Sequence, residues 1–156
     1  MGKPPRWTRA VLGDADLEAI SRAIRDAEAR TSAEIRVHLE RQVKHLRWGG
    51  RTDPLERARR LFTHLGMHRT AERHGVLVYL ALEDRKLAIV GDGGIHARVG
   101  DQYWRRVCDL MLGRLRAGAI RDGIVLGITE VGRVLSEHFP RRPDDTNELS
   151  DEVSVS

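Results

Sequence analysis

The sequence is poor in the residues that build disulfide frameworks, base-stacking surfaces and membrane spans. Cys108 is its single cysteine, so no disulfide can form within the chain. Aromatic residues make up 4% of the 156 residues, which leaves few rings on which nucleic-acid bases could stack. No apolar run approaches the roughly 20 residues that cross a bilayer, and no secretory apolar region follows the basic N-terminal residues. These absences predict a cytoplasmic protein without a membrane span.

Motifs of several common enzyme classes are also missing. The sequence contains no HExxH, no GxSxG and no GxxxxGK[ST], which excludes the usual zinc-peptidase, serine-hydrolase and P-loop signatures. In "VGDGGIHARVGD", Gly91 and Gly93 match the start of a dinucleotide fingerprint, but His96 replaces its third glycine. The aspartate between these glycines would repel a phosphate. This segment therefore favours a cation over a nucleotide.

The composition predicts one globular domain with an uneven distribution of charge. Apolar residues make up 40% and charged residues 32% of the chain, whose net charge is +4. The segment from Pro140 onward has two arginines against five acids, so the rest of the chain is more basic than the total. Arginines elsewhere alternate with glutamates on helical faces, and no nucleic-acid motif is present. We expect a protein partner rather than nucleic acid, and a monomer or weak dimer.

Apolar spacing predicts four helices. The first begins near residue 14 with Asp14 as N-cap, and the second begins at Pro54 after an N-cap at Asp53. Two further amphipathic helices cover residues 101–118 and 120–139.

Three strands are predicted between these helices. Residues 33–40 alternate apolar and polar, which indicates a strand buried on one face, with Arg36, His38 and Glu40 on the other. Residues 76–82 and 86–90 form an apolar hairpin that needs cover on both faces. The predicted fold is one α/β/α sandwich over residues 14–140, with helices on both faces of a mixed sheet of about four strands. An N-terminal extension (1–13) and an acidic tail (141–156) flank it.

Four acidic residues beside the hairpin are candidate metal ligands. Glu83 and Asp84 lie on the hairpin turn, Asp92 follows the second hairpin strand, and Asp101 precedes a helix. Carboxylates on glycine-rich loops suit hard cations such as calcium, and a crossover could bring three of these acids together. The alternative is structural: Asp84 shapes the turn and Asp101 caps the helix.

Three segments together resemble the TPM domain family, named for a thylakoid-lumen protein, a photosystem II repair protein and a nematode receptor modulator. They are "AEIRVHLE", "RTAERHGVLVYLALEDRKLAIVGDGGIHARVGDQYW" and "AGAIRDGIVLGITEVGRVLSEHFP". His74 replaces the family's usual Asn, and Glu83-Asp84-Arg85 stands at its Asp-Asp-Arg. "GDGG" replaces the commoner Gly-aromatic-Gly, and the whole is similar to a short bacterial subgroup without membrane anchors.

The resemblance implies an α/β/α sandwich that binds a divalent cation, calcium first and magnesium second. It places Asp84 and Asp92, together with Glu83 and Asp101, in the metal site. It also implies acid phosphatase activity, for which Arg85 is a candidate anion clamp and His96 a candidate acid. No pattern fixes the mutual geometry of these groups, so a non-catalytic interaction module is the favoured hypothesis and a metal-dependent phosphatase the alternative.

The acidic tail offers a second candidate site for a cation or partner. It carries Asp144, Asp145 and Glu148 and begins with an Arg-Pro pair that favours an extended chain. The alternatives are a solubilising tail and a tail that folds back on the basic domain.

Overall fold

The computed structural model describes residues 4–43, 53–67, 74–141 and 153–156. The elements in chain order are α1 (Arg6–Arg9), α2 (Asp14–Glu28), β1 (Glu34–Glu40), α3 (Pro54–His64), β2 (Gly75–Ala81), β3 (Lys86–Gly91), α4 (Gly93–Val99), α5 (Asp101–Arg116), α6 (Ile120–His138) and β4 (Ser154–Val155).

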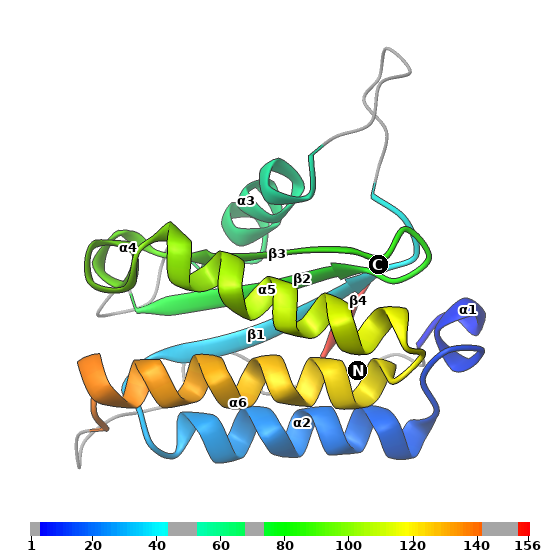
Figure 1. Cartoon of the computed structure of the whole chain (residues 1–156), viewed down its shortest axis with the longest axis horizontal. Coiled ribbons are helices and arrows are strands. Elements are labelled where there is room, and N and C mark those ends of the chain that lie inside the picture. Colours follow the sequence, from blue (N-terminus) through cyan, green and yellow to red (C-terminus); the bar gives the residue numbers. More distant parts are fainter. Residues whose placement is uncertain (1–3, 44–52, 68–73, 142–152) are drawn as a thin grey trace.

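The four strands form one mixed sheet in the order β3-β2-β1-β4 (Figure 1). β1 runs parallel to both β2 and β4, whereas β2 and β3 form the predicted antiparallel hairpin. Helices α2, α5 and α6 form a layer on one face, and α3 covers the other (Figure 1). The predicted α/β/α sandwich is therefore confirmed, with three helices on one face and one on the other.

Alternating strand residues separate two apolar clusters. The larger cluster joins α2, α5 and α6 to one face of the sheet through residues such as Ile35, Val37 and Val78. The smaller cluster packs α3 against the other face, on which Leu77 and Tyr79 lie. The period of two in the strands therefore determines which side chains meet which helix.

The three-helix layer is packed closely enough to require glycine. A Cβ on Gly127 of α6 would contact the Met111 side chain of α5. A Cβ on Gly132 would lie 2.7 Å from the Cβ of Ala27 on α2. Ala27 has no flexible side chain that could move aside, so α6 approaches α2 closely at Gly132, whereas the Met111 side chain at Gly127 is flexible.

The helix boundaries agree closely with the sequence. Asp53 caps α3 as predicted, since its side chain accepts a hydrogen bond of 3.0 Å from the Leu55 N–H. For α2 the predicted cap was wrong by one residue: Gly13 is the N-cap and Asp14 is the first helical residue. The side chain that turns back to this cap is Asp16, which accepts from the Gly13 N–H at 3.0 Å.

Two predictions at the sheet were incomplete. β1 is not exposed on its polar face, because His38 is 4% exposed and Glu40 is 2% exposed. The end of the acidic tail is not separate from the domain either, because Ser154 and Val155 pair with β1 and Val153 is buried. Both differences arise because residues distant in sequence meet at β1. Arg57 of α3 binds the Glu40 carboxylate, and β4 pairs beside β1 as a further strand of the sheet.

Candidate functional site

The hairpin turn holds the acid pair Glu83 and Asp84. Residues 82–85 connect β2 to β3, and Arg85 adopts a left-handed conformation with φ of 52°. The exposed Glu83 accepts hydrogen bonds from the side chains of Arg41 and Gln42, which follow β1. Asp84 is half-buried and accepts a 2.7 Å bond from the Val43 N–H through one oxygen. The turn is thus joined to the chain that leaves β1, and both acids remain accessible at least in part.

The glycine segment is helical, which the sequence did not predict. Asp92 is the N-cap of α4, and one of its oxygens accepts from the Ile95 N–H at 3.1 Å. Its other oxygen accepts from the Gly75 N–H at 2.6 Å, where β2 begins. Asp92 is 7% exposed, so its carboxylate holds the start of α4 against the sheet and is closed to solvent on most sides.

Asp101 lies on the surface next to the other candidate loop residue, His96. Gly100 is the N-cap of α5, so the expected capping role of Asp101 is wrong: its side chain makes no cap bond. Instead a carboxylate oxygen lies 3.4 Å from the Nδ1 atom of His96, and both side chains are more than half exposed. Such an exposed contact contributes little to stability.

The four predicted ligands do not converge. Glu83 and Asp84 precede β3, whereas Asp92 and Asp101 follow it, and the six residues of β3 span about 20 Å. Among the residues that the structure describes, no group of three His, Cys, Asp or Glu side chains is arranged to hold a metal ion. The expected meeting of these loops is therefore wrong, because the antiparallel hairpin keeps its turn and its open end apart. Arg85 and His96 are separated in the same way.

The acids of the second candidate site, Asp144, Asp145 and Glu148, lie outside the described residues.

A buried ionic group behind the hairpin turn was not predicted. Arg57 of α3 donates two hydrogen bonds of 2.8 Å to the Glu40 carboxylate, and the Tyr79 hydroxyl donates a third of 2.8 Å. The Glu40 side chain is 3% exposed and that of Arg57 is 16% exposed. This group fixes α3 to the carboxyl ends of β1 and β2, next to Glu83 and Asp84.

The electrostatics of this group follow from burial and hydrogen bonding. Burial acts to raise the pKa of Glu40, but the hydrogen bonds from Arg57, Tyr79 and Ser156 outweigh it and lower that pKa to about 2. Burial and the adjacent carboxylate raise the pKa of Tyr79, whose hydroxyl therefore stays protonated. The hydrogen bond to Glu40 raises the pKa of Arg57. The group is therefore a fixed carboxylate–guanidinium pair, and none of its members gains or loses a proton near neutral pH.

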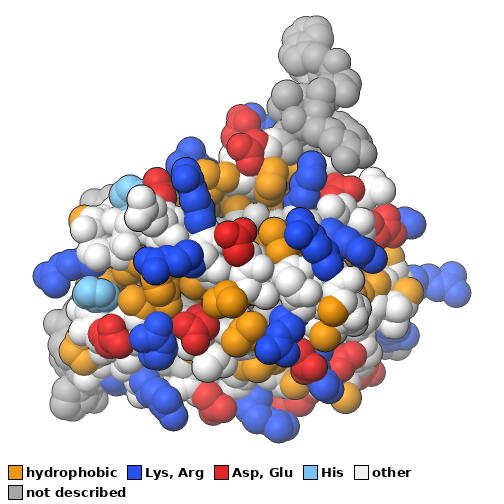
Figure 2. All heavy atoms as spheres, viewed as in Figure 1, with side chains coloured by type: hydrophobic (Ala, Val, Ile, Leu, Met, Phe, Trp, Pro, Cys, Tyr) orange, Lys and Arg blue, Asp and Glu red, His pale blue; other side chains and the backbone are white. Residues whose placement is uncertain are grey.

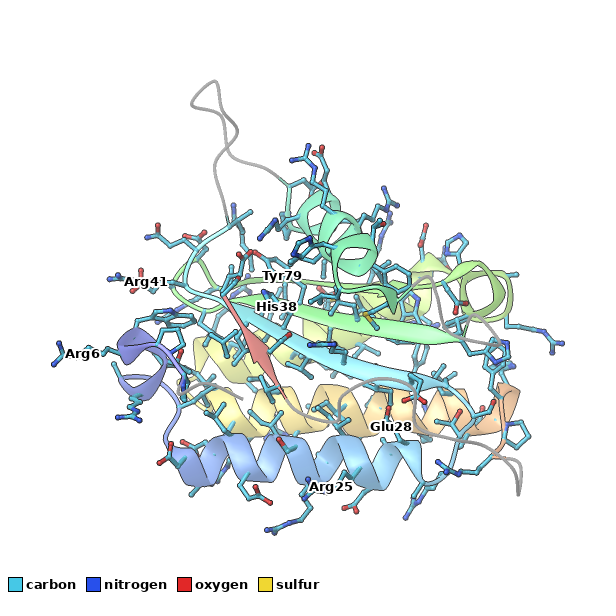
Figure 3. The ribbon with its side chains drawn as sticks, turned by 180° about the vertical axis from the view of Figure 1, so that it is seen from behind. Arg6, Arg25, Glu28, His38, Arg41 and Tyr79 are labelled. Atoms are coloured by element: carbon cyan, nitrogen blue, oxygen red, sulfur yellow. The ribbon has the colours of Figure 1, made fainter. Side chains whose placement is uncertain are left out.

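His38 connects this group to the last residues of the chain. Its Nδ1 lies 2.7 Å from the Ser154 hydroxyl, and its Nε2 lies 2.8 Å from the Ser156 hydroxyl. Ser156 in turn donates to Glu40 at 2.8 Å. Figure 3 shows His38 and Tyr79 side by side, facing α3 and close to β4. Hydroxyl side chains of the C-terminal segment thus pair with the polar face of β1 and close it to solvent.

The sequence carried only a weak signal for this group. Strand alternation placed His38 and Glu40 on the same face, together with Tyr79 of β2. Arg57 gave no signal of its own, because one helical arginine resembles any other until its partner is known.

Similarity to known proteins agrees with this arrangement. A family model described as the TPM domain matches residues 8–134. The chain belongs to the TPM domain family. The expected resemblance is confirmed, and the match includes β1, the hairpin, both acid-bearing ends of the hairpin and most of α6.

Two solved structures share this TPM fold. The NMR structure of the BA42 protein from the psychrophilic bacterium Bizionia argentinensis is 37% identical, with a TM-score of 0.82 over 93% of this chain and 95% of that one. The solution NMR structure of the N-terminal domain of a P. gingivalis protein is 20% identical, with a TM-score of 0.67 over 83% and 79% of the two chains. The second likeness concerns the fold alone. No curated protein matches.

The described helices also bear on membrane association. None of them combines the length and the apolar character that crossing a bilayer requires. Basic, acidic and apolar side chains are interspersed over the face formed by the three-helix layer (Figure 2). On this face the basic side chains therefore alternate with acidic and apolar ones (Figure 2).

Proposed function

We propose that this TPM domain binds a divalent cation, calcium in particular, at the hairpin turn and acts as a non-catalytic module for protein partners. The observation that carries the proposal is the state of the Asp84 carboxylate. One oxygen is held by the Val43 N–H at 2.7 Å, and the side chain is half-buried beside the exposed Glu83. An oriented carboxylate next to a second one is a suitable start for an oxygen-rich site.

The contacts of the two acids favour Asp84 as the principal ligand. Glu83 pairs with Arg41, whose side chain is 61% exposed, so a cation can displace this arginine at small cost. Asp92 is less suitable, because both of its oxygens accept backbone N–H bonds. Calcium accepts six to eight oxygens with flexible geometry, so water and turn carbonyls can complete a site that two carboxylates begin. Magnesium requires a stricter octahedron and is the weaker candidate.

The arrangement favours binding over phosphoester hydrolysis by the residues proposed for it. A phosphatase needs an anion clamp and a proton donor within reach of one phosphate. Arg85 and His96 lie at opposite ends of β3 and cannot act on the same group. A phosphatase assembled from these residues is therefore disfavoured, and purified protein should not turn over p-nitrophenyl phosphate with calcium or magnesium between pH 4 and pH 8.

Calcium titration of metal-stripped protein, followed by amide NMR, tests the proposal. Saturable shifts are expected at residues 41–43 and 82–86. Asp84→Asn should abolish them, whereas the control Asp101→Asn, which removes an equally charged and more exposed acid, should leave them unchanged. Shifts confined to residues 144–152, shifts that survive Asp84→Asn, or a flat titration would each contradict this site.

A further inference from the structure

The C-terminal segment, residues 153–156, binds at the same end of the sheet as the hairpin turn. The residues of β4 run parallel to β1 and pair with His38 and Leu39. Glu40, the next residue of β1, lies opposite Ala81, after which the turn begins. Figure 1 and Figure 3 both show the end of β4 at this end of the sheet. The segment therefore lies next to the proposed cation site.

The segment is attached to β1 over a short length. Its strand is two residues long, against seven residues each for β1 and β2. Val153 is 7% exposed and belongs to the larger apolar cluster, and the Ser156 N–H donates to the Leu39 carbonyl at 3.0 Å. A short strand of this kind opens at a lower cost in free energy than the long central strands.

Two consecutive carbonyl groups of β1 connect this segment to the hairpin turn. The Leu39 carbonyl accepts from the Ser156 N–H at 3.0 Å, and the Glu40 carbonyl accepts from the Leu82 N–H at 2.9 Å. Successive carbonyls of an extended strand point to opposite sides, so the segment and the turn bind adjacent peptide groups from opposite directions. A change in the position of this backbone on one side therefore reaches the other.

The Glu40 side chain makes a second connection. Its Oε2 atom accepts from the Ser156 hydroxyl and from the Arg57 guanidinium, both at 2.8 Å. If the segment leaves, water reaches this buried carboxylate and weakens its attraction to Arg57. The contact that fixes α3 beside the turn thus also depends on the C-terminal segment.

Residues 41–43 carry this connection to both acids of the turn. The Arg41 carbonyl accepts from the Glu83 N–H at 2.9 Å, and the Arg41 side chain pairs with the Glu83 carboxylate. The Val43 N–H holds one oxygen of Asp84 at 2.7 Å. The position of residues 41–43 therefore determines how the two carboxylates lie, and a cation binds more tightly to ligands that are already ordered.

We infer that the C-terminal segment is a strap that regulates the cation site at the hairpin turn. When docked, it holds Leu39 and Glu40 in place, orders residues 41–43 and raises the affinity of the turn for calcium. When released, it leaves this end of the sheet less ordered and the affinity lower. Because such a coupling is reciprocal, bound calcium also stabilises the docked segment. The regulation rests on the proposed cation site, whereas the ordering of the turn does not require calcium.

Hydrogen exchange of the full chain in EDTA tests the ordering of the turn. Val153→Asp places a charge in the apolar cluster and should release the segment, which faster exchange of the Ser156 amide verifies. We expect the amides of Val43 and Glu83 to exchange about tenfold faster in this variant. The Ile95 amide at the other end of the hairpin should change by less than about twofold.

A milder variant separates release of the segment from a general loss of structure. Ser156→Ala removes the hydroxyl that contacts His38 and Glu40 and adds no charge. It should accelerate the same two amides by about threefold. Ser136→Ala is the matched control, because the Ser136 hydroxyl bonds to the Arg133 carbonyl within α6, and it should leave them unchanged.

Calcium titration of the same proteins tests the regulation. Val153→Asp should weaken calcium binding at the turn about fivefold, whereas Ser136→Ala should bind calcium like the unchanged protein. In the unchanged protein, saturating calcium should slow the exchange of the Ser156 amide, because the coupling acts in both directions.

The outcomes distinguish the strap from the cation site. Unchanged exchange at Val43 and Glu83 in both strap variants would overturn the inference, and so would an equal acceleration at Ile95, which indicates general destabilisation. Equal calcium affinity with the segment docked and released would overturn the regulation. A flat calcium titration of the unchanged protein would overturn the cation site and its regulation together. The exchange rates in EDTA would then separately support or overturn the ordering of the turn.

Discussion

The two ends of the β2–β3 hairpin both carry aspartates beside a bend, yet their environments differ. At the turn, Asp84 accepts one backbone bond, remains half-buried and lies next to a second acid. At the open end, Asp92 accepts two backbone bonds and is 7% exposed. The first carboxylate has one oxygen outside the hydrogen bond from Val43, and both oxygens of the second accept backbone hydrogen bonds. Similar residues in similar sequence contexts can thus have opposite roles, and hydrogen-bond partners distinguish them.

The largest expected effect concerns the ionic group behind the turn. Arg57→Ala leaves the Glu40 carboxylate buried without its counter-charge, so the free energy of unfolding should fall by about 3–5 kcal/mol. Urea denaturation measures this change. Arg60→Ala, on the same helix but with a side chain 59% exposed, is the control and should change stability by less than about 1 kcal/mol. Equal losses of stability in the two variants would mean that the contact between Arg57 and Glu40 does not stabilise this end of the sheet.

The second prediction concerns pH. The pKa of Glu40 is about 2 in the folded protein and 4.5 for an ordinary glutamate, so its contribution to stability is complete above about pH 4.5. That contribution is lost as the pH falls towards 2, because the unfolded chain then binds the proton more readily. Denaturation curves should show a smaller loss between pH 4.5 and pH 2 for Glu40→Gln than for the unchanged protein. Parallel curves would contradict the assigned pairing.

The third prediction concerns the open end. Asp92→Ala removes the acceptor for both the Gly75 and Ile95 N–H groups, so stability should fall by about 1–3 kcal/mol. Thermal unfolding of this variant and of Asp101→Ala measures the difference, since the exposed Asp101 should contribute less than about 0.5 kcal/mol. A calcium response that depended on Asp92 as strongly as on Asp84 would remove the distinction between the two ends.

The smallest effect is expected at the turn itself. Arg85 has a φ of 52°, which glycine adopts without strain, so Arg85→Gly should raise stability by about 1 kcal/mol. Lys86→Gly, one residue later and inside β3, should lower it instead. Denaturant midpoints compare the two variants. If Arg85→Gly also destabilises, Arg85 makes a contribution beyond the turn, such as the anion binding suggested by the sequence.

Local signals in the sequence predicted much of the fold. Asp53 followed by Pro54 indicated the start of α3, and the apolar runs on either side of residues 82–85 indicated the hairpin. These features depend on neighbours in the chain, through capping, fixed proline geometry and strand alternation. α4 was not predicted, because Gly93 and Gly94 suggest a loop unless the cap at Asp92 is recognised.

The candidate site could be predicted only in part. The sequence identified Glu83 and Asp84 as adjacent acids on a turn, and this is how they lie. It also suggested that Asp92 and Asp101 meet them, which depended on a crossover that the antiparallel pairing of β2 and β3 does not provide. Convergence of loops is a property of strand order and direction, and the spacing of acids along the chain does not encode it.

By itself, the sequence determined the hairpin, the main helices and the membership in the TPM family, because each depends on local patterns of apolar, polar and turn-forming residues. The tertiary structure alone decided that Glu40 is buried against Arg57 and that the Ser154 and Ser156 hydroxyls close the polar face of β1. These contacts join segments far apart along the chain. Whether a charge is solvated, paired or available to a ligand depends on what packs against it in space, and this is why the roles of these polar residues followed from the fold.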